Sequence, residues 1–240
     1  MQLAGKAALV TGGTAGIGEQ MALQLKAKGA SVIVTGRSPE GLDRARQAGF
    51  QAIAADLSHP EGAQAIVDAL GDRPIDILIN NAGQGVDHDF RAAAPDPDAA
   101  DDCIYANLNT PIRLIAALLP RLRERPEAAI VNVTSGLAIA PNTGSAVYCA
   151  TKAGLRSYTQ SLRAQLAGGN VHVIEALPPV VDTAMTAARG GKKLPASECA
   201  LQIVDAIERD RPEANVGMVK LLRTVHSASP ALARRIMLRF

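Results

Sequence analysis

The sequence predicts an α/β fold with a doubly wound parallel sheet, in a single domain over residues 1–240. Apolar, β-branched runs alternate with helical patterns along the chain, which is the order that βαβ units produce. A glycine-rich segment separates the first run from the first helical pattern. A hydrophobic content of 48% over 240 residues is enough for a large core.

Each expected strand is a short apolar run, and each expected helix has apolar residues at helical spacing. We expect strands at Ala7–Thr11, Ser31–Thr35, Gln51–Ala54, Ile75–Asn80, Ala128–Thr134, Val171–Ala176 and Val216–Val219. We expect helices near 16–28, 39–48, 60–70, 98–123, 146–168 and 197–209, with a loop at 92–98. Pro111 lies inside the longest helical pattern and predicts a kink or a break there.

A last helix is expected at about 230–239, because Ser229 and Pro230 make a good helix start. About ten residues are few for a helix that lies on a membrane surface. We therefore expect this helix to pack against the body or against a second subunit.

The composition excludes several classes of protein. The net charge is only +2, so no general attraction to nucleic acid is expected. The chain has no run of 18 apolar residues and no signal-peptide pattern, so no membrane segment is expected. The three cysteines are isolated, which indicates neither a metal site nor a disulfide framework and favours a cytoplasmic location.

Gly12, Gly16 and Gly18 lie between the first strand and the first helix. Glycine permits positive φ and lets the backbone approach a ligand closely. The following helix presents free N–H groups and the positive end of its dipole, which suits a pyrophosphate. The segment predicts a dinucleotide site; the alternative is a tight turn that binds nothing.

Arg37 follows the second strand, where dinucleotide-binding folds meet the adenosine ribose. An acidic residue there binds the hydroxyl of NAD, whereas an arginine accommodates the phosphate of NADP. Arg37 therefore predicts NADP(H), with a solvated surface residue as the alternative. Asp56 follows the third strand and either accepts from the adenine amino group or caps the next helix.

Two asparagines also belong to the expected site. Asn81 begins the turn Asn81-Ala82-Gly83 after the fourth strand, at the edge where open α/β sheets bind ligands. Asn107 lies about one turn before Pro111, and a break inside a helix frees backbone groups that can hold water.

Ser135 follows the fifth strand, and Tyr148 and Lys152 are four residues apart on the next helix. Residues at this spacing share a helix face. An ordinary tyrosine has a pKa of about 10, and a neighbouring ammonium favours the phenolate. We expect Lys152, together with an oxidised nicotinamide, to lower the pKa of Tyr148. The alternative is that both are ordinary residues of the helix surface.

These residues resemble the short-chain dehydrogenase/reductase family over nearly the whole chain. The matching motifs are Thr11-Gly12-x3-Gly16-x-Gly18, Asn81-Ala82-Gly83, Asn107, Ser135 and Tyr148-x3-Lys152. The resemblance implies a seven-stranded Rossmann-type sheet in the order 3-2-1-4-5-6-7, with helices on both faces. It also implies a homodimer or homotetramer formed through the helices at 98–123 and 146–168.

By resemblance, Tyr148 is the general acid in reduction and the base in oxidation, and Ser135 binds the substrate oxygen. Lys152 holds the nicotinamide ribose and tunes Tyr148, while Asn107 positions a water that relays protons through Lys152. The expected cofactor-binding set is Gly12, Thr14, Gly16, Ile17, Gly18, Arg37, Asp56, Leu57, Asn81, Ala82, Gly83, Tyr148, Lys152, Pro178, Val181 and Thr183.

The chain departs from the family after the sixth strand. The usual Pro-Gly-x-Val-x-Thr is replaced by Pro178-Pro179-Val180-Val181-Asp182-Thr183, and proline removes an N–H and fixes φ. Val181 and Thr183 still match positions that contact the nicotinamide carboxamide. This stretch, with residues 211–213 and 220–222, looks like a bacterial subgroup of the family named for D-alanine esterification of teichoic acid.

Residues 184–196 are rich in small and basic residues and are interpreted as a lid over the nicotinamide. Its cations, Arg189, Lys192 and Lys193, either attract an anionic substrate or belong to a solvated loop. His88 and Asp89 follow the fourth strand and either line the pocket or are ordinary loop residues.

The sequence therefore predicts an NADP(H)-dependent oxidoreductase that acts on a small carbonyl or secondary alcohol. The alternative is a non-catalytic NADP(H)-binding sensor or scaffold, although binding alone does not need a tyrosine acid. An epimerase or dehydratase on the same fold would need a larger substrate region than remains after residue 176.

Overall fold

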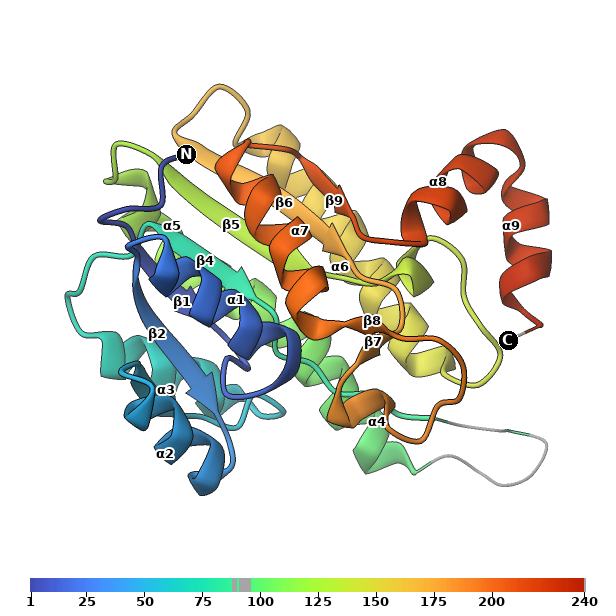
Figure 1. Ribbon diagram of the computed structural model, residues 1–240, viewed down its shortest axis with the longest axis horizontal. Helices are drawn as coiled ribbons and strands as arrows, with labels where there is room; N and C mark the ends of the chain where they lie inside the picture. Colours follow the sequence, from blue (N-terminus) through green and yellow to red (C-terminus); the bar gives the residue numbers. More distant parts are fainter. Residues whose placement is uncertain (88–89, 91–95, 240) are drawn as a thin grey trace.

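The computed structural model describes residues 1–87, 90 and 96–239, and a seven-stranded parallel sheet forms its centre (Figure 1). The strand order is β3-β2-β1-β4-β5-β6-β9, which confirms the predicted fold. The strands of this sheet are β1 (Ala7–Val10), β2 (Ser31–Gly36), β3 (Gln51–Ala54), β4 (Ile77–Asn80), β5 (Ala128–Val133), β6 (Val171–Leu177) and β9 (Glu213–Asn215). The α-helices are α1 (Gly16–Ala27), α2 (Pro39–Gln47), α3 (Pro60–Leu70), α4 (Pro97–Ile104), α5 (Thr110–Arg123), α6 (Ala146–Gln165), α7 (Ala196–Glu208), α8 (Val219–Ala228) and α9 (Pro230–Met237).

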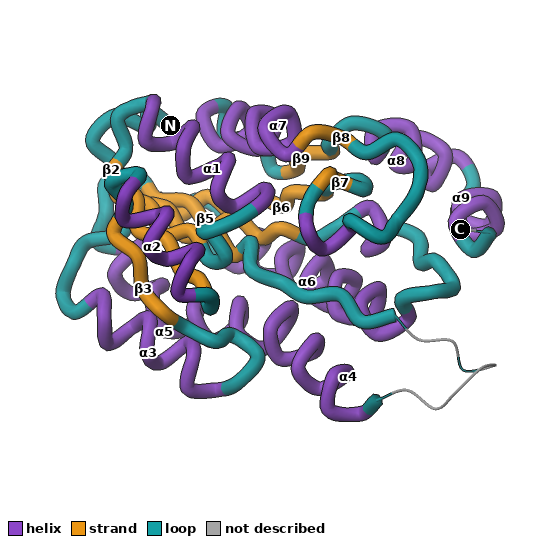
Figure 2. Tube along the Cα trace, turned by 60° about the horizontal axis from the view of Figure 1, so that its bottom comes forward, coloured by secondary structure: helices purple, strands orange, loops and turns teal. Residues whose placement is uncertain are grey.

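Alternate residues of the central strands point to opposite faces of the sheet. In β1, Ala8 and Val10 pack into the core that includes α1 and α7, whereas Leu9 packs into the core that includes α3 and α5. Figure 2 shows these helices on the two sides of the sheet. The strand order reverses between β1 and β4. The crevice at the carboxyl ends of strands at such a point is where open α/β sheets bind ligands.

The last strand differs from its prediction. The expected strand at Val216–Val219 is wrong, because β9 spans Glu213–Asn215 and Val219 begins α8. Gly217 has a φ of +52° and turns the chain at this point. Val216 and Val219 are both buried beside the turn. The apolar residues at 216–219 are therefore explained by burial at a turn and not by a strand.

The helical pattern at 98–123 is interrupted before Pro111, as that residue predicted. Helix α4 ends at Ile104, a π-helical turn spans Tyr105–Asn109, and α5 begins at Thr110. Pro111 has no N–H, so the carbonyl of Asn107, one α-helical turn earlier, has no α-helical donor. Residues 92–95 of the expected preceding loop lie outside the described part of the chain.

Helices α8 and α9 stand together at one end of the molecule (Figure 1). A Cβ added to Gly136, just after β5, would lie 3.0 Å from Val219 Cγ2 and 3.6 Å from Leu222 Cδ2. Helix α8 therefore covers the residue that follows Ser135. Within the described part of the chain, no helix has both the length and the hydropathy needed to span a bilayer.

A buried ion pair ties α6 to β6 and β5. Arg156 Nη1 on α6 lies 2.6 Å from Glu175 Oε2 on β6. Thr134, which directly follows β5, donates from Oγ1 to Glu175 Oε1 at 2.7 Å. The Glu175 side chain is completely buried and that of Arg156 is nearly so. Removing one partner of such a pair leaves a buried charge uncompensated.

Glu175→Gln is expected to lower the free energy of unfolding by up to about 3–5 kcal/mol, because the buried Arg156 keeps only the longer contact to Glu213, at 3.4 Å. Urea unfolding followed by circular dichroism measures the loss. Asp205→Asn is the control, because its ion pair with Arg209 is exposed and contributes at most about 1 kcal/mol. Similar losses in the two variants would show that the buried pair does not tie the elements together.

Candidate active site

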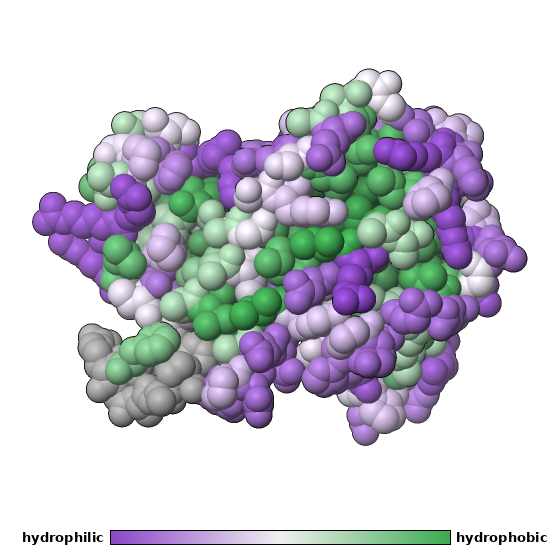
Figure 3. Space-filling model, turned by 180° about the vertical axis from the view of Figure 1, so that it is seen from behind, coloured by the Kyte–Doolittle hydropathy of each residue, from purple (hydrophilic) through white to green (hydrophobic). Residues whose placement is uncertain are grey.

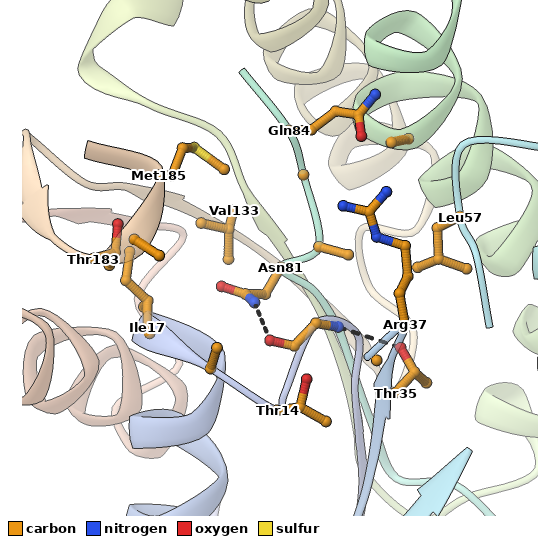
Figure 4. Close-up of a pocket in the computed structure, with 18 of the residues that line it drawn as sticks. Thr14, Ile17, Thr35, Arg37, Leu57, Asn81, Gln84, Val133, Thr183 and Met185 are labelled. Atoms are coloured by element: carbon orange, nitrogen blue, oxygen red, sulfur yellow. Dashed lines mark hydrogen bonds between the residues drawn. The ribbon is translucent and has the colours of Figure 1, made fainter. Parts of the chain in front are cut away.

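A cleft lies along the carboxyl ends of the strands on both sides of the point where the strand order reverses (Figure 4). Most of the predicted cofactor-binding residues line it: Gly12, Thr14, Gly16, Ile17, Arg37, Asp56, Leu57, Asn81, Ala82, Gly83, Tyr148, Lys152, Pro178 and Thr183. Two of the predicted set do not line it. Gly18 packs below the turn, and Val181 is buried in the short strand β7 (Val181–Asp182).

The glycines of the first turn have distinct physical roles. Gly12 and Gly16 have φ values of +62° and +56°, which L side chains rarely adopt. At Gly18, an added Cβ would overlap the Gly12 carbonyl oxygen and Asn81 Nδ2, so this glycine permits close packing of α1. Ala15 at the N-cap of α1 provides no side-chain acceptor, so the first-turn N–H groups lack a capping oxygen. This cradle fits the pyrophosphate of a dinucleotide.

Two polar side chains hold the turn in place. Asn81 Nδ2 donates to the carbonyl oxygens of Thr11 at 2.9 Å and Gly12 at 3.3 Å. The Gly12 N–H donates to Thr35 Oγ1 at 3.2 Å (Figure 4). Asn81 therefore joins the end of β4 to the turn after β1 and also lines the cleft.

Arg37 and Asp56 face each other at the end of the cleft beside β2 and β3. Arg37 Nη1 lies 3.8 Å from Asp56 Oδ1, and both side chains are exposed. Asp56 Oδ1 also accepts from the Ser58 N–H and from Ser58 Oγ. The N-cap of α3 is His59, so the alternative that Asp56 caps this helix is wrong. Partial burial works to raise the pKa of Asp56, but the Ser58 hydrogen bonds and the Arg37 charge lower it overall.

Ser135, Tyr148 and Lys152 come together beside the cleft. Ser135 follows β5, and its hydroxyl lies near enough to Tyr148 to act to lower the pKa of the phenol. Lys152 Nζ is buried and donates to the carbonyl oxygen of Val133 at 2.9 Å. The same atom lies 5.6 Å from the centre of the Tyr148 ring. The structure thus brings a hydroxyl, a phenol and an amine from β5 and α6 to one place.

Burial sets the protonation of this group. It raises the pKa of Tyr148 to about 12, against the lowering effects of the Ser135 hydrogen bond and the Arg189 charge. Burial also lowers the pKa of Lys152 to about 8. The expected lowering of the Tyr148 pKa by Lys152 is therefore not found in the protein alone. Desolvation destabilises the phenolate more than the nearby charges stabilise it.

Asn107 lies in the π-helical turn and is completely buried. Its side-chain amide is hydrogen-bonded to both backbone groups of Gln84, at 2.9 Å each, and donates to Thr151 Oγ1 at 3.1 Å. An added Cβ on Gly83 would lie 2.8 Å from Asn107 Oδ1 and 3.3 Å from Lys152 Nζ. Gly83 therefore lets Asn107 and Lys152 approach the end of β4.

The proposed lid is held at both ends. Strand β7 pairs with β8 (Leu194–Pro195), a two-stranded sheet that the sequence did not predict. Between them, Arg189 Nη2 lies 3.3 Å from Asp87 Oδ1 and 3.1 Å from Ser145 Oγ. Sequence reasoning missed Asp87 and Ser145, and neither belongs to a local motif. His88 and Asp89, also considered as pocket residues, lie outside the described part of the chain.

Among the described residues, Glu127, His172 and Asp210 come close enough together to hold a metal ion. The N-terminal ammonium of Met1 lies 3.3 Å from Asp210 Oδ2 and 3.9 Å from Glu127 Oε1. A positive charge already faces these carboxylates.

Comparison with known proteins identifies similar chains. A family model described as short chain dehydrogenase matches residues 6–193. An uncharacterized oxidoreductase of Bacillus subtilis, DltE, is 40% identical over 189 residues, 77% of this chain and 75% of that protein. A short chain dehydrogenase from Burkholderia cenocepacia, solved with NADP, aligns with a TM-score of 0.88 at 28% identity and covers 99% of both chains. A 3-ketoacyl-(acyl-carrier-protein) reductase from Brucella melitensis, solved with NADH, has a TM-score of 0.77 at 28% identity and covers 85% of this chain and 91% of its own.

Lys152→Met is expected to stabilise the protein near pH 7 by up to about 3 kcal/mol, less the loss of the hydrogen bond to Val133, since one pKa unit corresponds to about 1.4 kcal/mol. The folded pKa of Lys152, about 8, lies below its ordinary value of 10.5. The unfolded chain therefore holds more protons between pH 8 and 10.5, and stability rises with pH over this range. Chemical unfolding from pH 6 to 10.5 should show this rise in the parent and less of it in the variant. Lys220→Met, a substitution at an exposed lysine, is the control. If stability changes with pH in the same way in Lys152→Met and its parent, the lowered pKa of Lys152 is contradicted.

Proposed function

The chain belongs to the short-chain dehydrogenase family, and from this we propose that it is an NADP(H)-dependent oxidoreductase acting on a small carbonyl or secondary alcohol. The observation that carries the proposal is the meeting of Ser135, Tyr148 and Lys152 beside a cleft with a dinucleotide cradle. When bound, the nicotinamide donates hydride in reduction or accepts it in oxidation. The remaining chemistry belongs to the protein's own side chains.

In the proposed reduction, Ser135 and Tyr148 bind the substrate carbonyl oxygen. A tyrosine with a pKa near 12 is fully protonated at neutral pH and can donate its proton as the oxygen gains charge. In oxidation the same tyrosine accepts the proton of the alcohol, which requires the phenolate. The positive charge of an oxidised nicotinamide favours that phenolate, and its effect adds to that of Lys152.

Lys152 and Asn107 are proposed to move the proton onward. Lys152 has a lowered pKa of about 8, so it exchanges protons readily near neutral pH. The side-chain amide of Asn107 is already hydrogen-bonded to Gln84 and Thr151. Its backbone carbonyl, left without an α-helical donor by Pro111, is the group that suits a relay water.

The preference for NADP(H) is proposed from Arg37, which lines the cleft after β2. Asp56 lies 3.8 Å away and pairs with Arg37 when no phosphate is present. An incoming phosphate would compete with Asp56 for the guanidinium. Asp56 is also suitably placed to accept from the adenine amino group.

The rival proposal of a non-catalytic sensor or scaffold does not explain the partly buried Tyr148 beside the buried Lys152, because binding alone does not need a tyrosine acid. We further propose a cytoplasmic homodimer or homotetramer. The face that carries α5 and α6 shows apolar patches (Figure 3). Small exposed residues lie there, including Ala116 and Ala117 on α5 and Ala150 and Ala153 on α6.

Tyr148→Phe is expected to lower kcat for carbonyl reduction by about 10²–10⁴-fold, the usual contribution of a general acid. A screen of ketones and aldehydes scored by NADPH absorbance first identifies a substrate. NADPH fluorescence titration then shows that the variant is folded. Tyr158→Phe on the same helix is the matched control and should retain turnover. Retained turnover in Tyr148→Phe would remove this residue from the mechanism, and no turnover by the parent on any carbonyl would favour the sensor.

Arg37→Asp is expected to shift the ratio of kcat/KM for NADPH over NADH toward NADH. A charged hydrogen bond contributes roughly 1.5–3 kcal/mol. At about 1.4 kcal/mol per decade, the ratio should change by about 10- to 150-fold. Arg46→Asp, an exposed change on α2, is the control. An unchanged ratio in Arg37→Asp would defeat the assignment.

A further inference from the structure

We infer that Arg189, Asp87 and Ser145 form a subsite for a zwitterion, so that the preferred substrate is a β-hydroxy α-amino acid or its oxo form. This inference rests on the proposed function and names the substrate class for the same site. The carboxylate of the substrate would pair with Arg189 and its ammonium with Asp87.

The three residues come from separate segments and form a closed set of contacts. Ser145 Oγ donates to Asp87 Oδ1 at 2.5 Å and accepts from Arg189 Nη2 at 3.1 Å. Arg189 Nη2 also lies 3.3 Å from Asp87 Oδ1. Asp87 follows β4, Ser145 is the N-cap residue of α6, and Arg189 belongs to the segment between β7 and β8. Ser145 is buried and fixes the position of the charged pair.

The pair lies beside the reacting group. Ser145 is the N-cap residue of α6, and Tyr148 is the third residue of that helix, so both lie at its first turn. Arg189 Nη2 is held 3.1 Å from Ser145 Oγ, so the guanidinium lies at the end of α6 that carries Tyr148. If a substrate oxygen is held between Ser135 and Tyr148, charged groups on the neighbouring carbon atoms can reach Arg189 and Asp87.

Charge balance selects the zwitterion. The side chains of Asp87 and Arg189 are 72% and 37% exposed, so their ion pair contributes little and can be replaced by a ligand. A zwitterion leaves each protein charge with an opposite partner. An anion would place its carboxylate beside Asp87, a cation would place its ammonium beside Arg189, and a neutral alcohol would gain no charged contact.

The other lid cations do not offer the same site. Lys193 Nζ donates to the carbonyl oxygens of Thr186 and Ala187, within its own segment. Lys192 is exposed, and the described residues give it no ion pair. Of these three cations, Arg189 is therefore the one that contacts residues outside its own segment, namely Asp87 and Ser145.

The reaction in the oxidative direction is balanced. The carbon–hydrogen bond of the substrate's carbinol breaks and its electron pair leaves as hydride to NADP⁺. The hydroxyl proton passes to Tyr148. The products are a β-oxo amino acid, NADPH and one proton.

The test compares four alcohols with related carbon skeletons in the full chain with NADP⁺: threonine as all four stereoisomers, 3-hydroxybutanoate, 1-amino-2-propanol and 2-butanol. At least one threonine isomer should exceed each of the others by about tenfold or more in kcat/KM. Arg189→Gln should lower the ratio of threonine to 2-butanol turnover by at least about tenfold, mainly through KM. Asp87→Asn should shift the preference toward 3-hydroxybutanoate. Lys192→Gln, the matched lid cation, should leave these ratios unchanged.

Calorimetric titration with 2-aminobutanoate, which has both charges but no hydroxyl, measures binding without turnover. Its binding should weaken at least about tenfold in Arg189→Gln and remain in Lys192→Gln. Absent binding to the parent, or equal turnover of 2-butanol and threonine, would overturn the subsite. Turnover of a neutral alcohol or ketone with no binding of 2-aminobutanoate would overturn the subsite while leaving the proposed oxidoreductase function intact.

Discussion

The packing of α6 against the ends of β5 and β6 is the constraint on which the site depends. Lys152 Nζ donates to the Val133 carbonyl, and Arg156 pairs with Glu175, which also accepts from Thr134. These bonds join the helix that carries Tyr148 to the strand end that carries Ser135. A phenol and a hydroxyl from separate elements can act on one oxygen only if their spacing is fixed to within a fraction of an ångström.

The same packing sets the electrostatics. Removing both side chains from water moves the pKa of Tyr148 up, to about 12, and that of Lys152 down, to about 8. Both groups are thus moved toward their neutral forms. Burying these groups lowers the stability of the fold and keeps a protonated phenol in the site. Functional sites often combine lower stability with shifted pKa values in this way.

The sequence predicted the parts of the site that local patterns carry. Gly12, Gly16 and Asn81 could be recognised because a turn at a strand end demands their residue types. Tyr148 and Lys152 could be recognised because helical spacing puts them on one face. The contact between Arg189 and Asp87 could not, because the two residues are 102 positions apart and no periodicity joins them. The direction of the Tyr148 pKa shift also depends on burial, which spacing does not report.

Helix α8 covers Gly136, with Val219 and Leu222 against the position of its missing side chain. The residue next to Ser135 is thus covered by a part of the chain beyond the last strand of the sheet. A change of side chain on α8 can therefore alter the surroundings of Gly136, while β5 and α6 still hold Ser135, Tyr148 and Lys152. The residues around Ser135 and the groups proposed to react can in this way vary independently, because they belong to different segments of the chain.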